Sequence, residues 1–90
     1  MGVGDVCKQT RYVLQKIETA LREAGGSMDD VVRTRIYVSD IKDWEQVAAV
    51  HREVFGDIRP ATTLVEISSL VLPDMAVEIE VDAIVTEGEV

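Results

Sequence analysis

The sequence of 90 residues contains one cysteine, Cys7, and one histidine, His51. A single cysteine cannot form an internal disulfide, and no cluster of cysteine and histidine has the spacing of a metal site. Large side chains are also few, because the sequence has one tryptophan, two tyrosines and one phenylalanine. A short chain of this kind builds a small core and gains stability by self-association. We therefore expect no bound metal and an oligomer.

Basic residues are scarce as well. Nine Lys and Arg stand against seventeen Asp and Glu, which gives a net charge of −8, and no Lys or Arg follows Pro60. A protein that grips phosphates needs a basic stripe, so we expect no nucleic-acid partner. No apolar run approaches the roughly 20 residues that span a membrane. The start, residues 1–5, lacks the basic and apolar regions of a secretory signal. These absences predict a cytoplasmic protein with no membrane partner.

Two stretches near the C-terminal end alternate between two kinds of side chain. In the first, one face carries Ala61, Thr63, Val65 and Ile67, and the other carries Thr62, Leu64 and Glu66. In the second, Val77, Ile79, Val81 and Ala83 oppose Glu78, Glu80 and Asp82. Alternation with β-branched residues is typical of half-buried strands. The short polar link between them, through residues 72–74, predicts an antiparallel pair.

The first part of the chain indicates two helices with a strand between them. Asp5 can cap a helix whose apolar residues recur at helical spacing until Gly25 and Gly26 end it. Ser27 and Asp30 have the spacing of a capping box. The apolar side of the second helix, which Ser39 or Asp40 caps and Gly56 ends, comprises Ile41, Trp44, Val47, Ala48, His51, Val54 and Phe55.

Residues 31–38 form the predicted strand between the helices. Its apolar face comprises Val32, Thr34, Ile36 and Val38, and its second face comprises Arg33, Arg35 and Tyr37. The predicted order is therefore α-β-α-β-β in a single domain of residues 1–90, with α+β architecture and two helices on one face of the sheet. We expect the other face to be bare and to carry Arg33, Arg35, Thr62, Glu66, Glu78 and Glu80. An open sheet of this kind needs a partner surface.

Several segments resemble the RidA/YjgF family, also labelled the L-PSP endoribonuclease family. They are residues 4–11, 29–41, 44–55, 59–67 and 77–82, with sequences that include Arg-Pro-Ala-Thr-Thr-Leu-Val-Glu-Ile and Val-Glu-Ile-Glu-Val-Asp. The resemblance runs from about Gly4 to Val85. It implies a chorismate-mutase-like subunit that forms a homotrimer, with clefts between neighbouring subunits. It also implies hydrolysis of reactive 2-imino or enamino acids without metal or cofactor.

The sequence departs from the family in two ways. Family members begin with a β-hairpin that lines the cleft, and this sequence starts after it, so we expect a short member or a fragment. The carboxylate-binding Arg of deaminating members follows Pro-Ala, and Thr62 stands at that position here. A threonine cannot make the charge-assisted fork of a guanidinium. Ala48 likewise stands where well-known members have a site Asn.

The resemblance selects the candidate site residues. Glu80 matches the second glutamate of the family's Glu-Ile-Glu run and is the catalytic candidate, with Asp82 as the alternative if the register differs by two. Thr62, Thr63 and Arg59 are the substrate-binding candidates. Each also has a structural interpretation, since glutamate and threonine are common on solvated strands and a surface Arg commonly pairs with an acid. Arg59 lies three residues before Thr62, an offset that points to the opposite face of a strand.

Other reactive side chains favour structural interpretations. His51 is expected to be packed and hydrogen-bonded rather than catalytic, and Cys7 is expected to be an inert thiol. Tyr37 with its two neighbouring arginines favours a subunit contact over a cleft lining. Three functions stay open: a deaminase acting on imino or enamino compounds, a non-catalytic module that binds a small metabolite or a protein, and, least favoured by the charge, an endoribonuclease.

Overall fold

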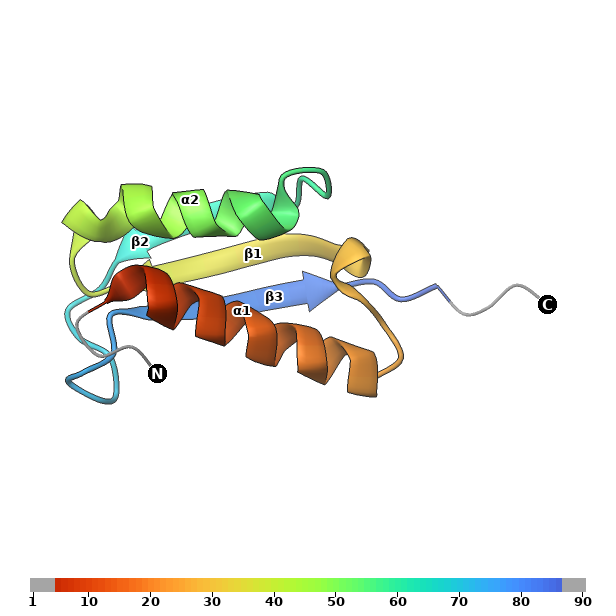
Figure 1. Ribbon diagram of the computed structural model, residues 1–90, viewed down its shortest axis with the longest axis horizontal. Helices are drawn as coiled ribbons and strands as arrows, with labels where there is room; N and C mark the ends of the chain where they lie inside the picture. The colour runs from red at the N-terminus through yellow and green to blue at the C-terminus, as the bar shows by residue number, and fades with distance from the viewer. Residues whose placement is uncertain (1–4, 87–90) are drawn as a thin grey trace.

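The computed structural model describes residues 5–86, so the expectation about a leader falls partly on residues 1–4, which lie outside it. The elements in chain order are α1 (Val6–Glu23), the 3-10 helix η1 (Met28–Asp30), β1 (Val31–Val38), the 3-10 helix η2 (Ile41–Asp43), α2 (Trp44–Phe55), β2 (Ala61–Glu66) and β3 (Val77–Ala83). Figure 1 shows α1 and α2 lying along the sheet. The predicted α+β order of helices and strands is confirmed.

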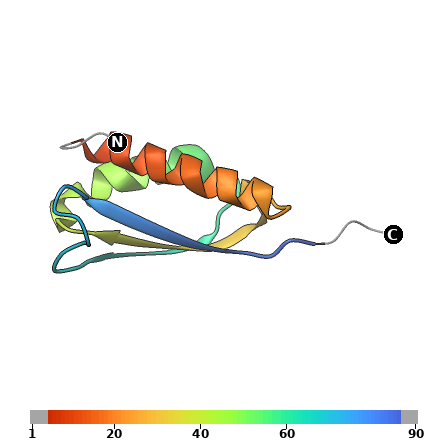
Figure 2. The same ribbon diagram turned by 90° about the horizontal axis from the view of Figure 1, so that it is seen from below.

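The two long helices cover the same face of one three-stranded sheet, as predicted. Turned to an edge-on view, the helices form one layer and the strands a second layer (Figure 2). Within residues 5–86 no element covers the opposite face of the sheet, which we call the open face. The face under the helices is called the helix face. This two-layer arrangement leaves half of the sheet surface without a partner in the described chain.

The predicted antiparallel pairing of the last two strands is wrong. The strand order is β2-β1-β3, so β1 lies between β2 and β3. β1 pairs with β2 in parallel and with β3 antiparallel. The helix α2 supplies the crossover that a parallel pair requires, and residues 67–76 carry the chain back past β1. The connection between β2 and β3 was therefore misinterpreted as a hairpin because only its local turn residues were considered.

The register decides which side chains of β2 face the helices. Thr34 pairs with Thr62 and Ile36 pairs with Leu64, and paired residues share a face of the sheet. Thr62 therefore lies on the helix face, not on the open face as predicted. The same correction applies to Glu66, whose carboxylate accepts a hydrogen bond from the Ile41 backbone nitrogen at 3.0 Å. The alternation of β2 was predicted correctly, but its inward face was assigned wrongly.

A β-bulge interrupts the start of β1. Val31 pairs with Ala83 and Arg33 pairs with Asp82, so Val32 is the extra residue between them. As a result Val31 is buried, with 3% of its surface exposed, whereas Val32 is 44% exposed. Placing Val32 in the core was therefore wrong. The regular alternation holds from Thr34 onward.

The predicted helix ends are confirmed for α1. The Asp5 carboxylate accepts a hydrogen bond from the Lys8 nitrogen at 3.1 Å, which caps the first turn. At the other end Gly25 has φ of +91°, a left-handed conformation that glycine adopts without a Cβ penalty. The capping box is also present, because the Ser27 nitrogen donates to the Asp30 carboxylate at 2.9 Å. Residues within one turn of each end therefore determine where this helix begins and ends.

The core lies between the helices and the helix face of the sheet. Its buried apolar residues are Val6, Leu14, Val31, Ile36, Val38, Val47, Val50, Phe55, Val77 and Ile79. Two residues assigned to the apolar side of the second helix, Ile41 and Trp44, are instead 42% and 49% exposed. Asp40 caps η2 by accepting from the Lys42 nitrogen, so the chain turns before α2 and these two side chains project from that turn.

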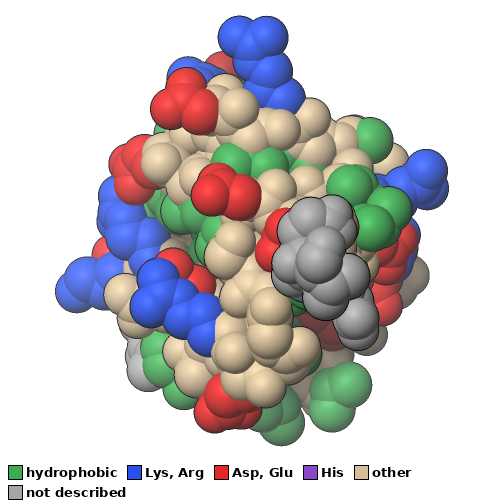
Figure 3. Space-filling model, turned by 90° about the vertical axis from the view of Figure 1, so that its right-hand side faces the viewer, with side chains coloured by type: hydrophobic (Ala, Val, Ile, Leu, Met, Phe, Trp, Pro, Cys, Tyr) green, Lys and Arg blue, Asp and Glu red, His purple; other side chains and the backbone are tan. Residues whose placement is uncertain are grey.

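Charged side chains of both signs are mixed at one end of the molecule. Figure 3 looks onto the end of the molecule that lies on the right in Figure 1, and blue and red side chains alternate there with green apolar ones. This face therefore shows no continuous basic stripe of the kind that binds phosphate backbones. No helix within residues 5–86 has the length and apolar character needed to cross a membrane.

Candidate functional site

A charged cluster occupies the open face where β1 and β3 meet. Arg35 donates from Nε to Glu80 Oε1 at 3.0 Å and from its two terminal nitrogens to the two oxygens of Asp82, each at 2.9 Å. Tyr37 donates its hydroxyl to the same Oε1 atom of Glu80 at 2.9 Å. The antiparallel register places Glu80 directly opposite Arg35. These contacts fix the orientation of the Glu80 carboxylate.

The cluster keeps Glu80 ionised. The hydrogen bond from Arg35, followed by the one from Tyr37, lowers the pKa of Glu80 below its ordinary value. Arg35 likewise lowers the pKa of Asp82. Within residues 5–86 the second oxygen of Glu80, Oε2, makes no hydrogen bond, and the side chain is 49% exposed. The arrangement therefore offers an ionised carboxylate with one fixed oxygen and one oxygen available to a water molecule.

Of the predicted site residues, Thr63 shares this face with Glu80. Arg35 pairs with Thr63 on one side and with Glu80 on the other, so all three side chains lie in one row across the sheet. The hydrogen bonds from Arg35 and Tyr37 to Glu80 were not predicted from the sequence. The predicted pairing of β2 with β3 left no place for β1 between these two strands. The basic face predicted for residues 33–37 was the available indication.

Thr62 belongs to a different polar group, on the helix face. Thr34 Oγ1 donates to Thr62 Oγ1 at 3.0 Å, and Thr62 Oγ1 donates to the Pro60 carbonyl at 3.1 Å. His51 Nε2 lies 3.0 Å from Thr34 Oγ1, and its ring packs against Phe55 with centroids 4.7 Å apart. His51 is thus packed and hydrogen-bonded, as predicted. Burial lowers the pKa of His51 below its ordinary value.

Arg59 lies in the turn between α2 and β2. Its backbone nitrogen donates to the Phe55 carbonyl at 2.9 Å, and its φ is +57°, which is uncommon for a residue that has a Cβ. Because β2 begins at Ala61, the strand offset used to orient Arg59 does not apply. Its side chain makes no ion pair within the described part of the chain.

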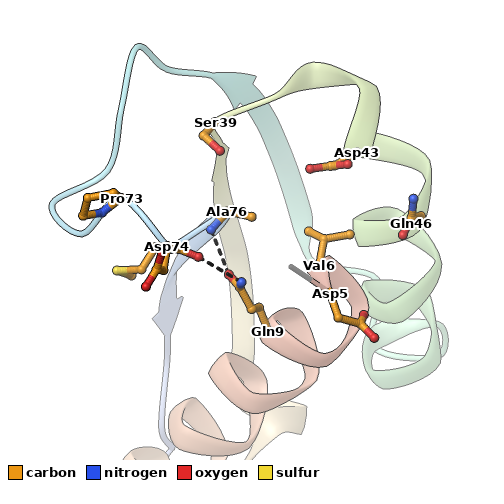
Figure 4. Close-up of a pocket in the computed structure, with 10 residues that line it drawn as sticks. Asp5, Val6, Gln9, Ser39, Asp43, Gln46, Pro73, Asp74 and Ala76 are labelled. Atoms are coloured by element: carbon orange, nitrogen blue, oxygen red, sulfur yellow. Dashed lines mark hydrogen bonds between the residues drawn. The ribbon is translucent and has the colours of Figure 1, made fainter. Parts of the chain in front are cut away.

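A separate cleft of about 620 Å³ opens at the N-terminal end of α1. Figure 4 shows its walls, which come from the start of α1, the start of α2 and the loop before β3. Gln9 is 1% exposed and ties this loop to α1, because it donates to the Asp74 carbonyl at 3.1 Å and accepts from the Ala76 nitrogen at 2.8 Å. None of the predicted site residues lines this cleft.

Gln9 was not singled out from the sequence, although a polar residue between Val6 and Val13 on the apolar side of α1 was a visible exception.

Cys7, near the cleft, is half-buried, and its Sγ donates to Gln46 Oε1 at 3.6 Å. Over residues 5–86 no group of three or more His, Cys, Asp and Glu side chains is placed to hold a metal ion.

Comparison of the sequence with known proteins identifies its family. A family model described as Endoribonuclease L-PSP matches residues 1–85. A RutC family protein of Pyrococcus abyssi is 39% identical over 77 residues, and the 3-aminoacrylate deaminase RutC of Acinetobacter baylyi is 42% identical over 77 residues. Each of these alignments covers 86% of this chain and 60% of the relative. The chain therefore spans about 60% of the length of these curated relatives.

Solved structures agree with the sequence relatives. A member of the YjgF/YER057c/UK114 family from Mycobacterium tuberculosis superposes with a TM-score of 0.92 at 52% identity, covering 94% of this chain and 71% of that one. A Rid family protein from Yersinia pestis gives a TM-score of 0.84 at 41% identity, covering 90% and 64%. The fold expected from the resemblance is therefore confirmed. From the match over residues 1–85 and these relatives, the chain belongs to the Endoribonuclease L-PSP family, which includes RutC and YjgF proteins.

Proposed function

We propose that this chain is a subunit of a cytoplasmic homotrimer that hydrolyses reactive imino and enamino compounds in clefts between subunits. An enamino compound first tautomerises to the imine, by gaining a proton at carbon and losing one from nitrogen. Water then adds to the carbon–nitrogen double bond, and the adduct releases ammonia to leave a carbonyl compound. The proposal uses neither metal nor cofactor. Its sequence support is the 42% identity with a protein named as a 3-aminoacrylate deaminase, of which this chain covers 60%.

The observation that carries the proposal is the orientation of Glu80. Its Oε1 accepts hydrogen bonds from Arg35 and Tyr37, which leaves Oε2 to accept one from a water molecule. An ionised carboxylate in that position can hold the water with a lone pair directed at the substrate carbon and then take its proton. Arg35 and Tyr37 prevent the carboxylate from rotating and keep it charged. Glu80 is the catalytic residue in this proposal, and Asp82 is held by Arg35 as a second anchor.

The positions of Glu80 and Thr62 support a site between subunits. Thr62 lies on the helix face of β2, and Glu80 lies on the open face of β3. The intervening strand β1 separates their strands by about 10 Å. A ligand that contacts both residues therefore needs Thr62 from one copy and Glu80 from another. The bare open face, which carries Tyr37 and the exposed Val65, offers surface for such contacts.

A non-catalytic binding member of the family is the second candidate. The observation that favours it is Thr62, which stands at the position of the carboxylate-binding Arg and directs its hydroxyl hydrogen to the Pro60 carbonyl. Such a member would hold a small metabolite or a protein partner without turning it over. The endoribonuclease function that the family name states is the third and weakest candidate, because the net charge is −8 and the face in Figure 3 shows mixed charges.

The native mass in solution, measured by light scattering on a size-exclusion column, is the first test. A mass of three chains is expected, and a monomer would contradict the intersubunit cleft.

Ammonia release from 2-iminobutanoate generated in the assay then tests the reaction. Glu80→Gln should lower kcat by about 100-fold or more, the usual contribution of a general base. The matched control is Glu78→Gln on the same strand and face, which should stay close to the parent. Equal activity of both variants would remove Glu80 from the mechanism.

A further inference from the structure

Three consecutive hydrogen bonds run from α2 across β1 to the edge strand β2. They join His51 Nε2 to Thr34 Oγ1 at 3.0 Å, Thr34 Oγ1 to Thr62 Oγ1 at 3.0 Å, and Thr62 Oγ1 to the Pro60 carbonyl at 3.1 Å. Thr34 at the centre has no exposed surface, and Thr62 at the end is exposed. We call these residues the polar chain.

The last acceptor fixes the direction of every bond in the polar chain. A carbonyl oxygen can only accept, so the single hydroxyl hydrogen of Thr62 points at Pro60. Thr62 Oγ1 must then accept from Thr34, which uses the single hydroxyl hydrogen of Thr34. Thr34 Oγ1 therefore accepts from His51, and the imidazole carries a hydrogen on Nε2. Only this order satisfies all three contacts.

We infer that His51, acting through Thr34, is a positioning residue that holds Thr62 as a hydrogen-bond acceptor toward solvent, and that Thr62 thereby selects ligands that present an N–H group. With its hydrogen held by Pro60, Thr62 Oγ1 has one lone pair occupied by Thr34 and one left. A ligand amino or imino N–H can donate to that lone pair. A carboxylate would face it with a second lone pair and gain nothing.

The surroundings of His51 keep the donor in place. Its helix neighbours one turn away, Val47, Ala48, Val54 and Phe55, are apolar, and its hydrogen-bond partner on the sheet, Thr34, is neutral. Burial is the only cause that lowers its pKa. Protonation at low pH adds a hydrogen to Nδ1 and leaves the Nε2 donor unchanged. The direction of the polar chain is thus the same in both protonation states.

This inference rests on the proposed function for its biological substrate, and it adds an orientation to it. The nitrogen of an imino or enamino substrate would lie at Thr62. This residue is on the helix face of the edge strand β2, whereas Glu80 is on the open face of β3. Substrates with a free N–H would be accepted, and N,N-disubstituted enamines would be excluded at this position. The same geometry applies to a binding-only member, so ligand selection can be measured without turnover.

Nitrogen NMR of the imidazole tests the first half of the inference. Because His51 is the only histidine in the sequence, labelled histidine gives one unambiguous pair of ring nitrogens. Above the pKa of His51 we expect the hydrogen on Nε2, with a resolved Nε2–H signal that exchanges slowly with water. A hydrogen on Nδ1 would mean that the polar chain runs the other way and would overturn the inference. Thr34→Val should make the Nε2–H exchange faster, and Thr34→Ser should restore the parent behaviour.

A matched ligand pair tests the second half. Isobutyramide and isobutyrate have nearly the same shape, but only the amide donates N–H. Titration of the protein, followed by the backbone amide signals of Thr62 and Thr63, should show about threefold to tenfold tighter binding of the amide, the size of one neutral hydrogen bond. Equal binding of the two probes, or tighter binding of the acid, would contradict the inference.

Variants separate positioning from a merely structural role. Thr62→Ser should keep the amide preference and Thr62→Val should abolish it. His51→Phe, which frees the Thr34 hydroxyl to turn, should reduce the preference toward one while the protein stays folded by circular dichroism. An unchanged preference in His51→Phe would remove the histidine from the inference. Absence of ammonia release from 2-iminobutanoate with an intact amide preference would reject the proposed reaction and leave this inference standing.

Discussion

The two edge strands of the sheet pair with the same central strand and differ in almost everything else. Two inward side chains of β3 are deeply buried, with Val77 and Ile79 at 1% and 8% exposure, and the other two, Val81 and Ala83, are half-buried. On β2 only Leu64 is half-buried, and every other residue of the strand is exposed. The inward positions of β2 instead carry Thr62 and Glu66, which make polar contacts with β1 and η2. β3 is a core strand at an edge, whereas β2 is a polar edge with little core of its own.

The two edge strands are therefore held in the sheet by different interactions. Packing under α1 holds β3 in place, so its outward side chains, including Glu80, are presented from a rigid strand. β2 depends on hydrogen bonds, and its outer edge stays open to a ligand or another chain. Changes to β3 should therefore cost stability, and changes to β2 should alter recognition.

The largest effect is expected from shortening a buried side chain of β3. Ile79→Ala should lower the free energy of unfolding by about 2–4 kcal/mol, because it removes buried methyl groups and leaves a cavity. Leu64→Ala, at the equivalent pairing position on β2, should cost about 1 kcal/mol because that side chain is only half-buried. Urea unfolding at one fixed protein concentration measures both. Equal losses of unfolding free energy in the two variants would show that β2 and β3 contribute equally to the core.

The loop that leads into β3 depends on a buried polar contact. Gln9→Ala should lower the free energy of unfolding by about 1–3 kcal/mol, because the Ala76 nitrogen and Asp74 carbonyl lose their partner. The matched control is Gln15→Ala on the exposed side of α1, with an expected change within about 0.5 kcal/mol. Hydrogen exchange should show faster exchange at Ala76 in the first variant alone. Slow exchange there would mean that the contact does not anchor β3.

Acid should weaken the open-face cluster. Arg35 lowers the folded-state pKa of Glu80 and Asp82, so the folded state resists their protonation. The stabilisation is present above their unfolded pKa values, near pH 4, and is lost as pH falls through the lower folded values. Arg35→Gln should therefore flatten the dependence of stability on pH below about pH 4. Arg33→Gln removes only a weaker charge effect on the pKa of Asp82, so it should flatten the slope less than Arg35→Gln does. A parent slope in Arg35→Gln would show that Arg35 does not lower these two pKa values.

The smallest effect concerns His51 beneath β2. Burial lowers its folded-state pKa below the ordinary 6.5, so the unfolded state binds protons more readily. The resulting stability is present above the unfolded pKa and is lost as pH falls from there through the folded pKa. Urea midpoints measured between pH 5 and 8 should fall slightly toward pH 5 in the parent and stay level in His51→Phe. A urea midpoint that rises toward pH 5 in the parent would contradict a lowered folded-state pKa for His51.

Local features of the sequence predicted local structure well. Asp5, Gly25 and the Ser27–Asp30 box marked helix boundaries that the structure confirms, because capping depends on residues within one turn. The alternation likewise identified the two sides of β3, and those of β1 from Thr34 onward. The family resemblance was confirmed by the match over residues 1–85. The positions that failed were those decided by contacts distant in sequence.

Strand pairing was the main failure, and it led to the wrong face for Thr62. Residues 72–74 contain proline and aspartate, which suit a tight turn, but nothing in them reveals that β1 lies between the two strands they connect. Because the parallel register with β1 sets the inward face of β2, Thr62 and Glu66 could not be assigned without it. The choice of Glu80, Thr62, Thr63 and Arg59 as site residues stays a prediction.

The extra residue at Val32 has a consequence for insertions and deletions in related chains. It shifts the alternation by one position, so that Val31 and Ile36 both point inward although they lie an odd number of positions apart in sequence. A chain that lacked Val32 would restore continuous pairing and leave the side chains beyond it unmoved. Loss of a residue at any later point of β1 would instead turn the rest of the strand over, exposing Ile36 or Val38 and burying arginine. The start of β1 is therefore the place in this strand where chain length can vary without scrambling the sheet.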